Sequence, residues 1–476
     1  MKKRPIVKPL MFFIAAILLS TGIFYFIKPL PDGTNFESDF QNVSQIKFLK
    51  DLTWVNKENT LEKDHEILNT ILKKIDEAKD FILIDMFLFN DFMGKPLKKD
   101  QSLSNKLKNA LIEKKKQNPD IFICVITDPI NTVYNGLVNP IFEELEKNKI
   151  KLIFTNLDEL RDSNPVYSAF YRVFLKSFGN SPAETIKSPF GDEKVSIRSY
   201  FKLLNFKANH RKTFICNTSS DIFAIVSSFN PHDPSSYHLN AGVLFNGKAA
   251  LDLLESEKAV LEISGFKNFP EFNFNFDNQE TREKIKIVTE NKISQNLISL
   301  INSTQKEDSL ELVMFYLSHR KTIKALKSAA KRGVKVKVLL DANKDAFGRK
   351  KNGIPNRVTG KELNNSGIFV KWGNTKGNQL HSKLVLIKKS SGENFLITGS
   401  ANLTRRNLDN YNLETNVIVK AKTDTTFFKD VVNYVNILFS NTDSKQFSLD
   451  YDKLGKNLFL KRYLYLFMEK TGISTF

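Results

Sequence analysis

The sequence predicts an α/β protein of two similar halves behind one N-terminal transmembrane helix. Each half is expected to be a mostly parallel sheet flanked by helices, with a pseudo-two-fold axis between the halves. Two observations lead to this: one order of helices and strands occurs twice, and an uncharged apolar run precedes both copies. With 476 residues, 41% of them hydrophobic and 40 of them Phe, the chain can bury a sizeable core, which excludes a disordered protein.

The apolar run follows the basic N-terminus MKKRPIVK. Residues 10–27 carry no charged side chain, and these 18 residues just suffice to cross a bilayer as a helix. A cleaved signal peptide is the alternative, but the run is longer than a usual h-region and no A-x-A-like site follows it. We expect residues 1–40 to form a cytoplasmic basic stub, an anchor and a linker. The catalytic part would then lie outside the cytoplasm, held to the cell membrane by a single pass.

Helices and strands then follow one another in the same order twice. The stretch 65–89 has the pattern of an amphipathic helix followed by a strand, and the stretch 293–317 repeats it. In each copy a second helix leads to a short apolar strand that ends in aspartate. Strand, helix and strand at this spacing are typical of a mostly parallel sheet covered by helices. We expect the first half over residues 41–277, and the second half with its C-terminal tail over residues 278–476.

The two halves differ in length between the aspartate and a later histidine. Asp128 and Asp341 are 213 positions apart, whereas His210 and His381 are only 171 apart. The first half therefore holds about 40 extra residues in this interval, and inserts before a catalytic strand usually build the rim of a site.

Each half next contains a His-x-Lys motif at the start of an apolar strand. The first motif is His210 with Lys212, and the second is His381 with Lys383. Residues two apart in a strand lie on the same face, so each histidine shares a face with its lysine. If two equivalent halves pack about a two-fold axis, both pairs converge on one site. Such a site would present two imidazoles and two ammonium groups to one phosphodiester.

A further strand in each half ends in Ser-x-Asn. These residues are Ser228 and Asn230 in the first half, and Ser400 and Asn402 in the second. Together with the lysines they can hold the non-bridging phosphate oxygens as negative charge builds up. One imidazole can attack phosphorus while the other protonates the leaving alkoxide. A neutral nucleophile and a protonated acid require two imidazole pKa values that are pushed apart.

Two His-x-Lys motifs, each followed by a Ser-x-Asn strand, resemble the phospholipase D superfamily, which includes phospholipases D, bacterial cardiolipin synthases and several nucleases. The resemblance covers residues 40–440. It implies a phosphohistidine intermediate, with His210 as nucleophile, His381 as general acid and no required metal or other cofactor. It also implies a carboxylate after the Ser-x-Asn strand that steadies a histidine. Glu414 has this place in the second half, whereas the first half offers only Asn240.

The sequence departs from the family pattern at two more positions. The family usually has aspartate five residues after the motif lysine, where this chain has Asn217 and Lys388. The missing carboxylates could support the strands rather than do chemistry. A catalytically degenerate protein that only binds anionic lipid or polymer therefore stays an alternative to the enzyme.

The charge of the chain narrows the choice of partner. There are 71 Lys and Arg against 52 Asp and Glu, a formal net charge of +19. Such a field favours phosphate-rich partners, although a solvated lysine-rich surface would give the same count. We expect a cardiolipin synthase-like phosphodiesterase or phosphatidyltransferase that acts on membrane phospholipids, anionic ones preferred. A nuclease is the alternative enzyme, and no protein partner is predicted.

Overall fold

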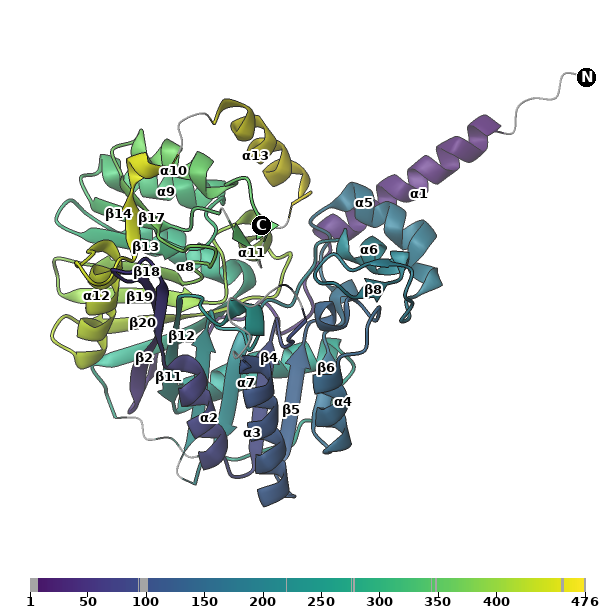
Figure 1. The fold of residues 1–476 in the computed structure, drawn as a ribbon, viewed down its shortest axis with the longest axis horizontal. Coiled ribbons are helices and arrows are strands. Elements are labelled where there is room, and N and C mark those ends of the chain that lie inside the picture. Colours follow the sequence, from purple (N-terminus) through teal and green to yellow (C-terminus); the bar gives the residue numbers. More distant parts are fainter. Residues whose placement is uncertain are drawn as a thin grey trace, which may run out of the picture.

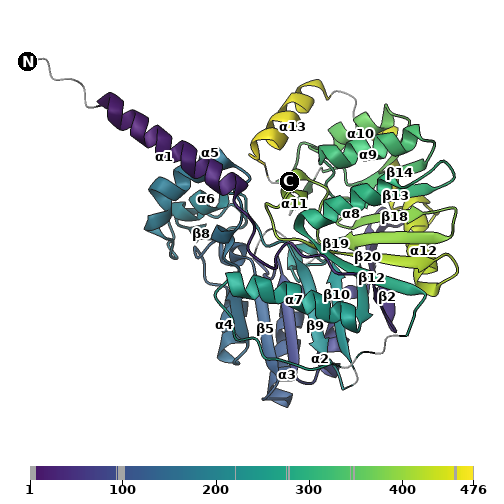
Figure 2. The ribbon, with the colours of Figure 1, turned by 180° about the vertical axis from the view of Figure 1, so that it is seen from behind.

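The fold of the chain is described here from a computed structural model, shown in Figures 1 and 2. The structure describes residues 7–92, 94, 102–219, 221–274, 276, 279–343, 345–346, 349–454 and 458–474. It contains two large sheets with helices around them and one long N-terminal helix that projects from the body.

The first sheet has eight strands in the order β3-β2-β11-β10-β9-β4-β5-β6. Strands β4, β5 and β6 are parallel neighbours, and every other pair in this sheet is antiparallel. In that order the strands are β3 (Leu61–His65), β2 (Ile46–Val55), β11 (Asn240–Asn246), β10 (Ile222–Ser227), β9 (Lys212–Asn217), β4 (Phe81–Met86), β5 (Phe122–Thr127) and β6 (Lys151–Phe154).

The second sheet repeats this order over seven of its nine strands. Its order is β1-β12-β20-β19-β18-β13-β14-β17-β21, with β13, β14 and β17 parallel and the other pairs antiparallel. The strands are β1 (Gln41–Asn42), β12 (Glu283–Thr289), β20 (Thr415–Lys422), β19 (Glu393–Gly399), β18 (Lys383–Lys388), β13 (Ser309–Met314), β14 (Lys335–Leu340), β17 (Phe369–Gly373) and β21 (Ser448–Asp450).

The expectation of mostly parallel sheets is wrong. Only the helix-connected strands of each half run parallel, because a crossover helix is long enough to return the chain to the same edge. The motif strands instead follow short turns: β9 leads into β10, and β18 into β19, as antiparallel neighbours. The mixed α/β class and the repeated order of elements are confirmed.

The two sheets pack against each other, and helices cover their outer faces (Figure 1). One apolar cluster lies between the sheets and joins β10 and β11 to β19 and β20. A second cluster lies under the first-sheet helices and a third under the second-sheet helices. The helices are α2 (Ile67–Glu77), α3 (Leu103–Gln117) and α4 (Pro140–Lys147) on the first sheet, α8 (Glu290–Asn302), α9 (Arg320–Lys331) and α10 (Asn356–Asn364) on the second, and α7 (Lys248–Ile263) and α12 (Thr426–Phe439) at the junction.

The first-half insert stands beside the N-terminal helix α1 (Val7–Ile27). It contains α5 (Pro165–Phe170), the π-helical turn η3 (Tyr171–Leu175), the short helix η4 (Lys176–Phe178) and α6 (Ile197–Leu203). Both views place α1 and α5 side by side, with the last helix, α13 (Phe459–Thr471), on the same end of the molecule (Figures 1 and 2).

A buried ion cluster joins the two halves behind the first motif. The Arg211 guanidinium lies 3.0 Å from a Glu290 carboxylate oxygen in the second half and 3.5 Å from one of Glu257 on α7. All three side chains are fully buried. Burial raises the pKa of Glu290 to about 7 even though the Arg211 guanidinium acts in the opposite direction, so the guanidinium favours the ionised form of this buried carboxylate.

Replacing Arg211 by methionine should lower the free energy of unfolding by about 3–5 kcal/mol, because the buried carboxylates lose their cation. Urea unfolding followed by tryptophan fluorescence measures the loss. Arg282→Met is the matched control, since Arg282 pairs with Asp424 at the exposed surface and its removal should leave the midpoint unchanged. Equal midpoints for both variants would contradict a role for the cluster in holding the halves together.

Candidate active site

The two motif histidines lie directly before β9 and β18, each in an extended segment held by the opposite half. The strands themselves begin at the motif lysines. The His210 N–H donates to the Leu413 carbonyl at 2.9 Å, and the Leu239 N–H donates to the Gln379 carbonyl at 3.2 Å. The segment before Glu414 thus pairs with the first motif, and the segment before Asn240 pairs with the second.

His210 receives its partner from the second half. Its Nδ1 lies 2.9 Å from one Glu414 carboxylate oxygen and 3.0 Å from the other. Glu414 is fully buried and also accepts hydrogen bonds from the Ser400 hydroxyl and the Asn407 amide. A carboxylate at Nδ1 fixes the proton on that nitrogen, so Nε2 keeps its lone pair. Glu414 therefore steadies a histidine, and that histidine belongs to the other half.

His381 has the mirror-image arrangement with an amide in place of the carboxylate. Its Nδ1 lies 3.1 Å from Asn240 Oδ1, and the Ser228 hydroxyl donates to the same oxygen at 3.0 Å. The Asn240 amide nitrogen donates to Asp51 Oδ2 at 3.1 Å and to the His238 carbonyl at 3.3 Å. These two acceptors orient the amide, so that its oxygen faces the imidazole. Asp51 therefore contacts Asn240, and Asn240 lies between its carboxylate and the His381 ring.

The motif lysines are buried next to their histidines. Lys212 Nζ donates to the His210 carbonyl at 2.6 Å, and Lys383 Nζ donates to the His381 carbonyl at 2.7 Å. Burial lowers the pKa of Lys212 to about 7 and moves the pKa of Lys383 well below its ordinary value. A phosphate oxygen between them would favour the charged form of both side chains.

The side chains of the two motifs lie close enough to influence each other's pKa. Lys383 contributes to lowering the pKa of His210, while Lys212 and His210 contribute to lowering that of His381. Burial is the main cause at both rings: the pKa of His210 falls to about 4, and that of His381 falls well below its usual range. Burial thus favours the neutral form of both imidazoles.

The Ser-x-Asn residues divide into two roles. The hydroxyls of Ser228 and Ser400 hold the amide and the carboxylate that contact the histidines. Asn230 accepts a hydrogen bond at 3.3 Å from a backbone N–H of the loop after β4. Among the described residues, the buried side-chain oxygen of Asn402 has no hydrogen-bond partner.

The positions of the missing motif aspartates lie at the far ends of β9 and β18. Asn217 Oδ1 accepts hydrogen bonds at 3.0 Å from the N–H groups of Asp80 and Phe81, where β4 begins. Lys388 Nζ lies 2.9 Å from a Glu311 carboxylate oxygen. Both side chains support strand ends, and neither contacts the histidines.

Three aromatic neighbours of the histidines had no assigned role at the sequence level. The Phe87 ring lies 4.7 Å from the His210 ring, and Phe315 and His238 each lie 5.1 Å from the His381 ring. The signal for the two phenylalanines was present, because a Met-Phe pair ends the equivalent strand in both halves. His238 has no counterpart in the repeat, and the distance to His381 depends on the fold.

The strand-end aspartates position the histidine segments. Asp128 Oδ2 accepts the Asn209 N–H at 2.7 Å, and Asp341 Oδ2 accepts the Leu380 N–H at 2.8 Å. Each carboxylate also caps the turn after its own strand. The equivalent hydrogen bonds fix the residue before each histidine.

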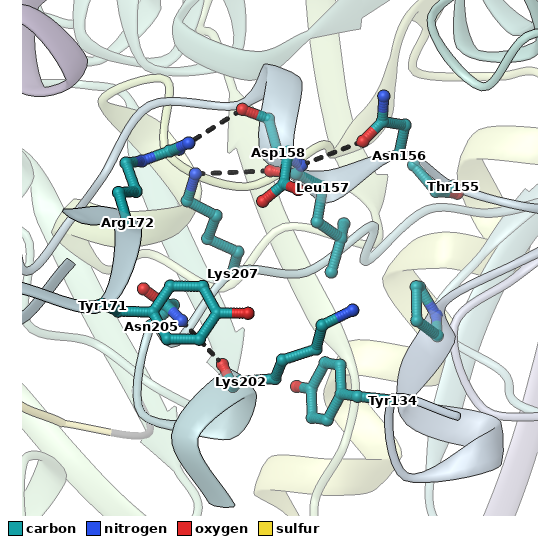
Figure 3. A pocket seen from close by; sticks show the side chains of 11 residues that line it. Tyr134, Thr155, Asn156, Leu157, Asp158, Tyr171, Arg172, Lys202, Asn205 and Lys207 are labelled. Atoms are coloured by element: carbon teal, nitrogen blue, oxygen red, sulfur yellow. Dashed lines mark hydrogen bonds between the residues drawn. The ribbon is translucent and has the colours of Figure 1, made fainter. Parts of the chain in front are cut away.

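A cavity of about 120 Å³ lies on the insert side of the first half (Figure 3). Lys202 reaches into it between Tyr134 and Tyr171, while Lys207 and Arg172 form its polar wall. Neither histidine lines this cavity. Within the described ranges, no group of three or more His, Cys, Asp or Glu side chains is arranged to hold a metal ion.

Residues 297–437 match the family model described as the PLD-like domain of cardiolipin synthase, where PLD stands for phospholipase D. The resemblance to the phospholipase D superfamily is confirmed. The match begins in α8 and ends in α12, so it includes the second phospholipase D motif with His381 and the support residue Glu414. No curated protein sequence matches the chain.

One solved structure extends the similarity in fold to both halves. Phosphatidylserine synthase of Haemophilus influenzae Rd KW20 is 11% identical, with a TM-score of 0.56 over 96% of this chain and 100% of its own. Polyphosphate kinase of Porphyromonas gingivalis is 12% identical over 85% of this chain and 51% of its own, with a TM-score of 0.45. The phospholipase D family member Nuc of Salmonella typhimurium is 19% identical over 35% of this chain and 97% of its own, with a TM-score of 0.27.

Proposed function

We propose that the chain is a membrane-anchored phosphodiesterase or phosphatidyltransferase of phospholipase D type that acts on phospholipids through a phosphohistidine. The observation that carries this proposal is the crosswise site, in which each half supplies the support residue for the histidine of the other. The matched strand orders further support a pseudo-two-fold relation between the halves. The family model named for cardiolipin synthase favours a lipid substrate.

The helix α1 supports the same choice of substrate. The segment Lys8–Ile27 contains an 18-residue window with a mean hydropathy of 2.4 and is long and apolar enough to cross a membrane. We propose that this segment is an uncleaved anchor with its basic end in the cytoplasm. Such an anchor would hold the site near lipid headgroups.

In the first step, Nε2 of His210 would form a bond to phosphorus as the bond to the leaving alkoxide breaks. The Glu414 carboxylate would offset the positive charge that the ring gains. His381 would first take up a proton when the anionic substrate enters. It would then donate this proton to the leaving alkoxide. The ammonium groups of Lys212 and Lys383 would stabilise the charge on the non-bridging oxygens.

In the second step, neutral His381 would accept a proton from water or an alcohol. The resulting oxygen nucleophile would attack phosphorus, and the bond to His210 would break. Water gives phosphatidic acid, whereas an alcohol gives a new phosphodiester.

A product assay tests this function. The full-length protein is placed in vesicles of phosphatidylglycerol or phosphatidylcholine, with His210→Ala as the control. We expect phosphatidic acid or cardiolipin from the wild type and neither from the variant. Absence of product from every lipid mixture contradicts the lipid function. Cleavage of single-stranded DNA or RNA that is lost in His210→Ala would assign the site to a nuclease.

The amide at Asn240 provides a test of the acid. Asn240→Asp places a carboxylate next to His381, which favours the imidazolium and raises its pKa. General-acid activity falls as pH rises through that pKa, so the falling limb of kcat should move to higher pH by about one to three pH units. The measurement is the pH profile of kcat with a phospholipid whose leaving group is an alkoxide.

A nitrophenyl phosphodiester is the matched control substrate for this variant. Its leaving group needs no proton, so the falling limb for bond breaking should not move. An unmoved limb with the phospholipid would show that His381 is not the acid.

A further inference from the structure

The last part of α1 is packed against the first-half insert. Gly22 of α1 packs against α5. A Cβ atom at this position would be 3.4 Å from the Pro165 carbonyl oxygen and 3.6 Å from Ala169 Cβ. One turn later, the Arg172 guanidinium stacks on the Tyr25 ring at 3.5 Å. The views from both sides show α1 and α5 lying along each other (Figures 1 and 2). Helix and insert therefore form one unit.

This contact fixes the depth of the insert if α1 spans a bilayer. Residues 10–27 rise by about 1.5 Å each, so the run measures about 27 Å and needs its full length for a hydrocarbon core of about 30 Å. Gly22 is five residues before the end of the run, which places it about 8 Å inside the hydrocarbon edge. The α5 helix reaches Gly22 only by entering the same leaflet.

The outward surface of the insert is suited to lipid. Residues 165–178 hold two charged side chains. Arg172 is turned inward to Asp162 at 2.9 Å, and Lys176 pairs with Asp158 at 3.0 Å. The side chains that face outward are apolar and exposed: Val166 (84%), Phe170 (46%), Val173 (36%), Phe174 (38%) and, on η4, Phe178 (65%). Five exposed apolar side chains on one short segment are unusual for a surface in contact with water.

The helix α13 continues this surface on the second half. Leu460, Tyr463 and Phe467 are exposed on it, together with the basic Arg462 and Lys470. Its last turn reaches the insert: a Cβ atom at Gly472 would clash with the Ser163 backbone, two residues before α5. A helix with exposed aromatic and basic side chains is typical of the headgroup region.

We infer that residues 165–178 form a wedge inserted into the lipid leaflet that holds the C-terminal end of α1, with α13 lying on the headgroups of that leaflet. This inference rests on the proposed anchoring by α1. Transfer of the exposed valine and phenylalanine side chains from water to acyl chains stabilises this position. The wedge holds the catalytic body at a fixed height and orientation on the bilayer, whereas a flexible tether would not.

Site-directed spin labelling of the full chain in phosphatidylglycerol and phosphatidylcholine vesicles tests the wedge. Cys124 and Cys216 are buried, so a cysteine at Val166 can be labelled selectively. We expect the label to be reached by oxygen and to be shielded from a water-soluble nickel complex. The matched control is Phe369→Cys, an exposed position (54%) on β17 of the second sheet, where nickel should reach the label freely. Equal nickel contact at both labels overturns the inference.

Activity gives a second, independent readout. Phe170→Glu places a charge in the leaflet, so this variant should lose most of its turnover of vesicle lipid and keep that of a soluble nitrophenyl phosphodiester. Phe369→Glu should keep both activities. Equal lipid turnover in the two variants contradicts the wedge. A wild type without lipid turnover would refute the proposed function, and spin labelling would still decide the position of residues 165–178.

Discussion

Replacing His210 by alanine should reduce the turnover of every phosphodiester to the background rate, even when the leaving group is good. The imidazole supplies the atom that attacks phosphorus, and no leaving group replaces a missing nucleophile. The measurement is the burst of nitrophenol from a nitrophenyl phosphodiester. His65→Ala is the control, since His65 lies on the edge strand β3 and hydrogen-bonds to Thr53 on β2, so its loss should leave the burst intact. A burst that survives in His210→Ala would show that this residue is not the nucleophile.

Replacing His381 by alanine should slow phospholipid turnover by about 10²–10⁴, because the alkoxide then leaves without a proton. Nitrophenol needs little protonation, so the burst should remain in this variant although steady turnover stops. The contrast between the two substrates identifies the acid. Loss of the burst here, with retention in His210→Ala, would exchange the two roles within one site.

The double variant tests whether the halves form a single site. Residues that act as one catalytic unit are strongly non-additive, so His210→Ala with His381→Ala should be no worse than His210→Ala alone. Partial losses that simply multiply would mean that the two halves do not share a phosphate.

Much of the fold could be predicted from local pattern. The amphipathic helix and buried strand of each half have clear periods, and α2 with β4 and α8 with β13 are found where the repeat indicates. The strand directions were mispredicted because the repeat was interpreted as a chain of crossovers. The short polar link between Asn217 and Ile222 is a hairpin signal, which requires antiparallel neighbours.

The candidate site depends on contacts between distant residues that local sequence pattern does not predict. The spacing of His210 and Lys212 places both at one strand end, and the second motif repeats it. The pattern predicts which face of its strand each motif residue occupies. It does not predict which residues of the other half pack against that face. The contact between His210 and Glu414 spans 204 positions, and that between His381 and Asn240 spans 141. Such contacts arise only from the packing of the two sheets.

The electrostatics also depend on packing. The chemistry of two histidines suggested separated pKa values, whereas burial lowers the pKa of both His210 and His381. The two histidines are buried because the two halves pack together around them. The motif alone does not predict this burial. In the proposed mechanism, the negative charge of a bound phosphate would favour protonation of His381.

The most direct test of a shared phosphoryl-transfer site is to trap the covalent intermediate. With a nitrophenyl phosphodiester, His381→Ala should release one nitrophenol per protein and then stop, since the second step lacks its base. Mass spectrometry should find the phosphoryl adduct on the peptide that contains His210. A stoichiometric adduct at His210 is the expected result. An unmodified His210 peptide after a full burst would contradict the account.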